Sequence, residues 1–284
     1  MAGKIILSAD SACDLSSELK ERCGIQYYPF QITLGERHYM DGVDIFPDDL
    51  YRAWREERLL PKTAAVGVGE YMDYFSGWVA QGYEVIHLNI GSSISAAHQN
   101  CLVAAKELGH VYPVDSGNLS SGIGLLALEA FDRIERGIPA PLIQKELQAL
   151  TRKVHASFVL DTLEFMAAGG RCSTAVALGA NLLNLKPCIM VNNKDASMTV
   201  GKKYRGNLEK VLPQYVRDTL SGRDDVRENR VFIVNSGISP ERVKLVRKAV
   251  RQFVPNGEIY EARASCTISS HCGPNTLGVM FMTR

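Results

Sequence analysis

Apolar runs of strand length that alternate with helix-length segments are the feature that most constrains the fold of this chain. Such runs occupy residues 4–9, 83–90 and 111–114, and a helix-like segment follows each of them. Strands joined through helices pair in parallel with right-handed crossovers, so the first half is predicted to form a mostly parallel sheet with flanking helices. A β-rich stretch and its return strand are expected at residues 25–34 and up to Tyr39. Helices are expected at residues 16–23, 48–57, 70–79, 95–108 and 119–136.

The second half continues the alternation and is predicted to form a mixed α/β domain. Pro139 and Pro141 open a helix that is expected to run to about His155, and we place a domain boundary near its end. The 284 residues then divide into two α/β domains, residues 1–153 and 154–284. A polar cluster at residues 192–195 predicts a hairpin, and residues 221–228 a charged loop. Strands are expected at residues 157–160, 187–191, 198–202, 231–234, 259–264 and 277–282, and helices at residues 163–168, 174–183, 207–220 and 240–253.

Composition and charge argue against several kinds of partner. The formal net charge of +1 offers no electrostatic reason to bind nucleic acid. No uncharged apolar stretch of about 18 residues occurs, and the first residues lack the pattern of a secretory signal, so we expect a cytoplasmic protein without integral membrane association. The seven cysteines include no Cys-x-x-Cys pair and are interpreted as reduced thiols. Asp10 and Asp14 could chelate a metal, but a turn residue and a helix-start acid are the simpler interpretation.

The usual enzyme motifs are absent or incomplete. No Gly-Lys-Ser or Gly-Lys-Thr of a P-loop is present. The segment from Gly91 to Ser95 approaches the Gly-x-Ser-x-Gly elbow of hydrolases, but Ser95 occupies the place of its last glycine. Gly122-Ile123-Gly124 fits a loose dinucleotide pattern about seven residues too late after its strand, and it indicates close helix packing. We therefore predict neither a catalytic residue nor a cofactor or metal.

Hydroxyl groups and glycines that follow strands form a candidate anion site. Ser95 lies where the next helix begins, and free N–H groups there suit a carboxylate or phosphate, although simple N-capping is the alternative. Thr63 and Ser120 lie in comparable places. Arg171 follows two glycines and suits a planar anion, with a surface loop as the alternative. His271 is expected in a tight turn, where a structural histidine is the alternative.

The order of these segments along the chain resembles that of the DegV family of bacterial fatty-acid-binding proteins. The similarity extends over essentially the whole chain. Its most specific parts are the Gly-Gly-Arg at residues 169–171 and the Lys-Pro at residues 186–187. The other segments similar to the family are residues 10–15, 92–99, 114–124, 163–168, 182–185 and 271–274.

The resemblance implies that a fatty acid is buried between two α/β domains, and that the protein is a carrier of lipid metabolism rather than an enzyme. It implies that Thr63 and Ser95 hold the carboxylate, with His271 close by. Arg171 and Arg205 are implied as contacts of a separate fatty acid kinase that receives the acid. Other ligand-binding positions implied by the resemblance are Ser92, Ser93, Ala96, His98 and Ser120.

Two segments depart from the family pattern, and two other hypotheses about the function stay open. Polar residues of the family are replaced at residues 64–66 and 96–98, where His98 is expected to be a new polar contact. One alternative is an acyl-group hydrolase or transferase with Ser95 as nucleophile and His98 or His271 as base. Another is a protein that takes a phosphorylated small molecule at Ser95 and Arg171.

Overall fold

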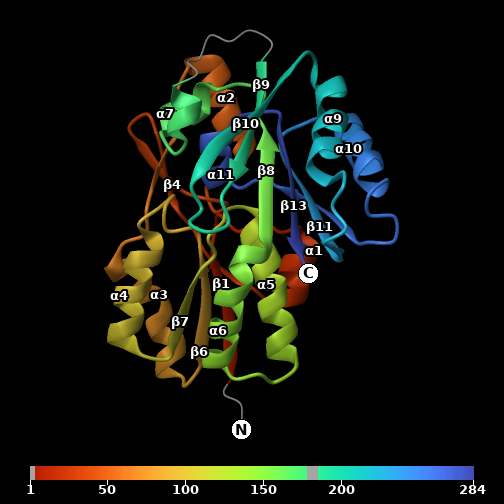
Figure 1. Cartoon of the computed structure of the whole chain (residues 1–284). Helices are drawn as coiled ribbons and strands as arrows, with labels where there is room; N and C mark the ends of the chain where they lie inside the picture. Colours follow the sequence, from red (N-terminus) through yellow and green to blue (C-terminus); the bar gives the residue numbers. More distant parts are fainter. Residues whose placement is uncertain (1–3, 178–184) are drawn as a thin grey trace.

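The computed structural model describes residues 4–177 and 185–284, and these residues form three β-sheets with helices packed around them (Figure 1). The N-terminal sheet has the order β2-β1-β6-β7, and all its neighbouring strands are parallel. Helix α3 packs against α4 and α5 against α6, on opposite sides of this sheet. The strands are β1 (Ile5–Asp10), β2 (Gln26–Tyr28), β6 (Glu84–Asn89) and β7 (Val111–Asp115), and the helices are α1 (Ser17–Cys23), α3 (Val68–Ala80), α4 (Ala97–Leu108), α5 (Ser121–Glu135) and α6 (Ala140–Leu150).

The C-terminal sheet has the order β10-β9-β8-β13-β11-β12 and mixes antiparallel pairs with the parallel pair β11–β12. Side chains that alternate along its strands pack into two hydrophobic cores, one on each face of the sheet. Val231 and Ile233 face a core closed by helices α9 and α10, whereas Phe232 and Val234 face the N-terminal half. The elements are β8 (Val154–Val159), β9 (Leu185–Val191), β10 (Met198–Arg205), α9 (Leu208–Leu220), β11 (Val226–Ser236), α10 (Pro240–Arg251), β12 (Ile259–Arg263) and β13 (Thr276–Thr283).

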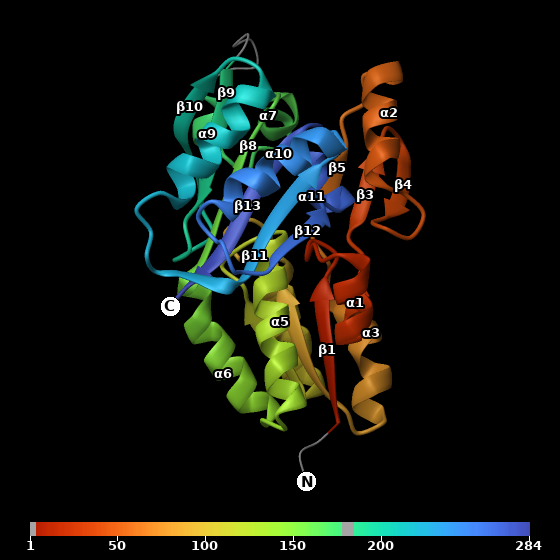
Figure 2. The ribbon, with the colours of Figure 1, turned by 90° about the vertical axis from the view of Figure 1, so that its right-hand side faces the viewer.

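A small sheet of order β4-β3-β5, built from N-terminal residues, packs together with α2 against the C-terminal half. Leu50 and Tyr51 pack there against Phe165 and Cys266. Figure 2 shows α2 and β3 beside α11 in the upper part of the molecule. The elements involved are β3 (Gln31–Leu34), β4 (Arg37–Met40), α2 (Pro47–Glu57), β5 (Lys62–Ala64), α7 (Glu164–Gly169), α8 (Ser173–Val176) and α11 (Cys266–Cys272). The boundary between residues 153 and 154 stays a prediction. The small sheet belongs entirely to the residues before it, but β5 and α2 contact α11 of the C-terminal half.

The predicted α/β architecture, with a parallel N-terminal sheet and a mixed C-terminal one, is confirmed, but three local predictions are wrong. The helix expected to run to about His155 ends at Leu150 and is followed by a 3₁₀ turn at Thr151–Lys153, because residues from Val154 on pair with β13 at the centre of the sheet. The charged loop expected at residues 221–228 is partly strand, since Val226 pairs with Thr283. Neither β5 nor α11 was expected. Of the helix expected at residues 174–183, only α8 lies in the described residues, and residues 178–183 lie outside them.

Candidate functional site

A narrow apolar cavity lies between the carboxyl ends of the N-terminal strands and the inner face of the C-terminal sheet. It holds about 780 Å³ that no protein atom fills, counting open solvent at its mouth. Ligands of α/β proteins commonly bind beyond the carboxyl ends of parallel strands, which is where this cavity lies. Its apolar lining includes Ile90, Ile94 and Leu119 from the N-terminal half and Phe158, Val234 and Met280 from the C-terminal half.

Thr63 and His271 meet at the wall of this cavity. Thr63 lies on β5, which pairs with β3, and His271 lies in the last turn of α11 rather than in the tight turn that we expected. The Thr63 Oγ1 and His271 Nε2 atoms are 2.9 Å apart. Burial, with the charge of Arg171 as a smaller cause, lowers the pKa of His271 to about 4. The imidazole is therefore neutral near pH 7.

The surroundings of the imidazole indicate which of its nitrogens carries the proton. Within the described residues the buried Nδ1 atom of His271 has no hydrogen-bond partner. A buried N–H without a partner is rarer and costlier than a buried acceptor without one, so we assign the proton to Nε2. His271 then donates to Thr63 Oγ1, and the Thr63 O–H is left to donate into the cavity.

Ser95 has a similar bonding pattern at the start of α4. The N-cap position belongs to Ala96, but Ser95 Oγ accepts a hydrogen bond of 3.2 Å from the Ala97 N–H. Its own O–H can therefore donate, and Ser95 lines the cavity together with Thr63. Two hydroxyl donors thus face an apolar space.

Ser120 lines the cavity too, but its hydroxyl is already used. It donates to Asp14 Oδ2, and the same carboxyl accepts a bond of 2.9 Å from the Ser265 N–H. Ser120 has a φ of 55° and a ψ of −136°, a left-handed conformation that a serine adopts only when its surroundings hold it there. Burial raises the pKa of Asp14 to about 7. The Ser120 hydroxyl is therefore not a third donor for an anion.

Arg171 lies at the exposed side of the cavity. Its Nη1 donates to the Gly169 carbonyl at 2.7 Å, and the residue lines the cavity while remaining exposed to solvent. A guanidinium placed at the mouth of an apolar cavity suits an anionic group of a ligand or of a partner.

The family model described as "uncharacterised protein, DegV family" matches residues 4–284. The chain belongs to the DegV family. The resemblance drawn from its sequence segments is thereby confirmed, although the segment at residues 182–185 lies mostly outside the described residues.

Individual DegV relatives match along their full length. A DegV domain-containing protein of Clostridium perfringens is 28% identical over 284 residues, which is 98% of both chains. The solved structure of a DegV family protein from Thermus thermophilus, described as fatty acid binding, is 27% identical and has a TM-score of 0.86, covering 99% of this chain and 100% of that one. A stearic acid-binding protein from Eubacterium ventriosum, at 23% identity and a TM-score of 0.83, covers 100% of this chain and 98% of its own and shares the fold.

Five of the expected site residues of this DegV protein lie outside the cavity lining. Ser92, Ser93 and Ala96 are exposed, because this part of the loop before α4 turns outward while Ile94 and Ser95 turn inward. Arg205 is exposed at the end of β10. His98, the expected new polar contact, instead lies 3.1 Å by its Nδ1 from Asn89 Oδ1, and burial lowers its pKa.

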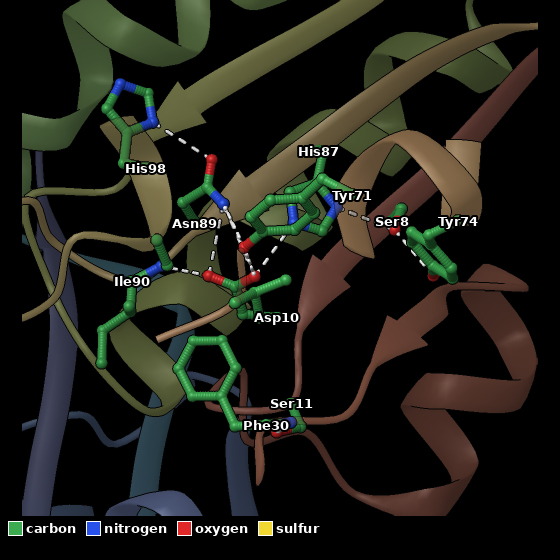
Figure 3. A network of polar contacts seen from close by, with 12 residues as sticks. Ser8, Asp10, Ser11, Phe30, Tyr71, Tyr74, His87, Asn89, Ile90 and His98 are labelled. Carbon is green, nitrogen blue, oxygen red and sulfur yellow. Dashed lines mark hydrogen bonds and ion pairs between the residues drawn. The ribbon is translucent and has the colours of Figure 1, made fainter. Parts of the chain in front are cut away.

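His98 belongs to a buried network around Asp10, at the end of β1 (Figure 3). The Asp10 carboxylate accepts hydrogen bonds from Tyr71 Oη at 2.6 Å, His87 Nε2 at 3.0 Å and the Ile90 N–H at 2.9 Å, with Asn89 Nδ2 at 3.3 Å. This network fixes the end of β6, from which the cavity residue Ile90 continues. The interpretation of Asp10 as a turn residue missed this role, and the only signal for it was the Asp-Ser-x-x-Asp segment itself.

Two aspartates of the N-terminal half hold the start of α11, the helix that carries His271. Asp41 accepts from the Cys266 N–H at 2.8 Å and the Thr267 N–H at 3.0 Å, and Asp14 accepts from the Ser265 N–H. Asp14 therefore stabilises the start of the distant helix α11. The interpretation of Asp14 as an acid at the start of the helix that follows it in sequence is wrong. Asp41 had no sequence signal, because its partners lie 225 and 226 residues further along the chain.

In the described ranges, 4–177 and 185–284, no group of three or more histidine, cysteine, aspartate or glutamate side chains is arranged to hold a metal ion. Among the helices described, none is long and apolar enough to cross a membrane.

Proposed function

We propose that this DegV family protein is a cytoplasmic carrier that binds a long-chain fatty acid, with the acyl chain in the apolar cavity and the carboxylate at Thr63 and Ser95. The observation that carries the proposal is the pair of hydroxyl donors at the wall of a cavity whose lining is otherwise mostly apolar. The description of the Thermus thermophilus relative as fatty acid binding supports it.

The energetics suit an amphiphile of this kind. Burial of each CH₂ group contributes about 0.8 kcal/mol, so an acyl chain of roughly 15 such groups contributes about 12 kcal/mol before the entropy cost of binding. The ionised headgroup needs hydrogen bonds, since an unpaired buried carboxylate is costly. The Thr63 and Ser95 hydroxyls supply them as donors, while the neutral His271 orients Thr63 without titrating near pH 7.

The bonding of His271 favours a carrier over an acyl hydrolase or transferase. A histidine that acts as a general base for a serine is normally oriented by a third group on its other ring nitrogen. In the described residues the Nδ1 atom of His271 has no partner of this kind. His98, the other base considered for Ser95, bonds to Asn89 instead.

Delivery of the bound acid to a separate fatty acid kinase is the second part of the proposal. Arg171, at the exposed side of the cavity, suits contact with such a partner or with the phosphate group that it transfers. Arg205, exposed at the end of β10, is the second basic contact in the proposal.

The first test is mass spectrometry of an organic extract of the purified protein. We expect a long-chain fatty acid in stoichiometric amount in the wild type. The double variant Thr63→Ala/Ser95→Ala should bind added palmitate roughly a hundredfold more weakly, because it loses two hydrogen bonds to a charged group. The matched control is Ser92→Ala/Ser93→Ala, which removes two exposed hydroxyls and should bind like the wild type.

Two outcomes would contradict the carrier. An empty extract together with no palmitate uptake by the wild type would exclude a fatty acid ligand. Recovery of a phosphate ester instead would indicate the phosphorylated small molecule, and labelling of Ser95 by a serine-directed inhibitor would indicate the enzyme.

A further inference from the structure

Two adjacent glycines at the end of α7 are required for different reasons. Gly170 has a φ of +68°, and a Cβ atom there would meet nothing within 4 Å. A glycine is therefore needed at this position for its backbone conformation, not for lack of space. Gly169 has no positive φ. A Cβ atom on Gly169 would lie 2.2 Å from His271 Nδ1 and 3.1 Å from its Cε1, far inside contact distance. Gly169 is therefore required by the closeness of the His271 ring.

The same close approach recurs one residue beyond α11. A Cβ atom on Gly273 would lie 2.8 Å from Cδ2 of Phe165, which belongs to α7. Helices α7 and α11 are thus packed closely at two places, and a glycine stands at each. The ring of His271 is confined between the backbone of Gly169 on its Nδ1 side and Thr63 Oγ1 on its Nε2 side.

We propose that Gly169 is a positioning residue for the headgroup site, because only a residue without a Cβ atom lets the His271 imidazole reach Thr63. This inference rests on the proposed function, in which Thr63 binds the carboxylate. A side chain at position 169 rotates the ring out of its 2.9 Å contact with Thr63, and the Thr63 hydroxyl loses the hydrogen bond that orients its proton toward the ligand.

A double-mutant cycle between Gly169 and His271 tests this role. We expect Gly169→Ala to weaken palmitate binding by about tenfold in the wild-type background, and by less than about twofold in the His271→Ala background, where no ring remains to collide. Equal losses in both backgrounds, or a Gly169→Ala variant that binds like the wild type, would overturn the proposal. Gly170→Ala is the matched control, because its conformational strain is independent of His271 and should act equally in both backgrounds.

Nitrogen-15 NMR of the imidazole separates this inference from the proposed function. The His271 signals, assigned by their loss in His271→Ala, should show a proton on Nε2 in the wild type and should shift in Gly169→Ala but not in Gly170→Ala. If the wild type takes up no palmitate but the ring responds in this way, the fatty acid function fails and the positioning role stands. An unchanged His271 signal in Gly169→Ala would contradict the positioning role, irrespective of which ligand the protein binds.

Discussion

Replacement of Asp10 by alanine is expected to lower the free energy of unfolding by roughly 5 kcal/mol, because it leaves three or four buried donors without an acceptor at about 1–3 kcal/mol each. The donors are Tyr71 Oη, His87 Nε2 and the Ile90 N–H, joined by Asn89 Nδ2. The hydrogen-bond network lies in the protein interior, where Asp10 and His87 are fully buried. A loss of this size is comparable with the whole stability of many domains, about 5–15 kcal/mol.

Chemical denaturation followed by circular dichroism measures this effect. Asp10→Asn keeps one oxygen acceptor, so its free energy of unfolding should lie between those of the wild type and Asp10→Ala. This variant allows the effect to be measured if the alanine variant does not fold. The matched control is Asp224→Ala on the exposed loop before β11, which should change the free energy of unfolding by less than about 0.5 kcal/mol. An Asp10→Ala variant within about 1 kcal/mol of the wild type would show that the network contributes little.

Asp14→Asn is expected to abolish a large pH dependence of stability. Burial raises the pKa of Asp14 from 3.8 to about 7 in the folded protein. Between these values the folded state keeps a proton that the unfolded state has released, so the stability of the wild type falls as the pH rises and the loss is complete above about pH 8. The Asp14 contribution to this fall is roughly 3 kcal/mol between pH 5 and pH 8.

The measurement is the free energy of unfolding of both proteins at pH 5 and pH 8. An asparagine does not titrate, but its side chain can still accept from the Ser265 N–H and contact Ser120. We therefore expect the stability of Asp14→Asn relative to the wild type to rise by roughly 3 kcal/mol from pH 5 to pH 8. Asp224→Asn, an exposed control, should show no such change. A relative stability that stays constant, or that falls with pH, would show that the Asp14 carboxyl is ionised in the folded protein across this range.

Elements whose signals lie within a few residues of one another were predictable from the sequence. Helix α1 begins at the Ser16 cap, whose Oγ accepts from the Leu19 N–H, and ends at Gly24 in a left-handed conformation. Helix α9 begins in the same way at Asn207. Each of these contacts joins residues three or four positions apart, so the local sequence contains both partners.

Segments that depend on distant partners were not predictable in this way. The residues around His155 have a sequence compatible with the end of a helix, but they form the central strand β8 because β13 pairs with them. Strand β5 is three residues long and exists through its pairing with β3. Helix α11 depends on Asp14 and Asp41, which accept its first N–H groups from the other half of the chain.

The sequence by itself determined the family, the alternation of strands and helices, and Thr63 and Ser95 as the hydroxyls of a candidate headgroup site. Only the tertiary structure decided that Ser120 is bound to Asp14, that Ser92 and Ser93 face solvent, and that Gly169 adjoins the His271 ring. The physical reason is that strand periodicity and helix caps act over a few residues. Hydrogen bonding and close packing at the cavity instead join residues that are about 100 to 250 positions apart, and no local pattern encodes their distances.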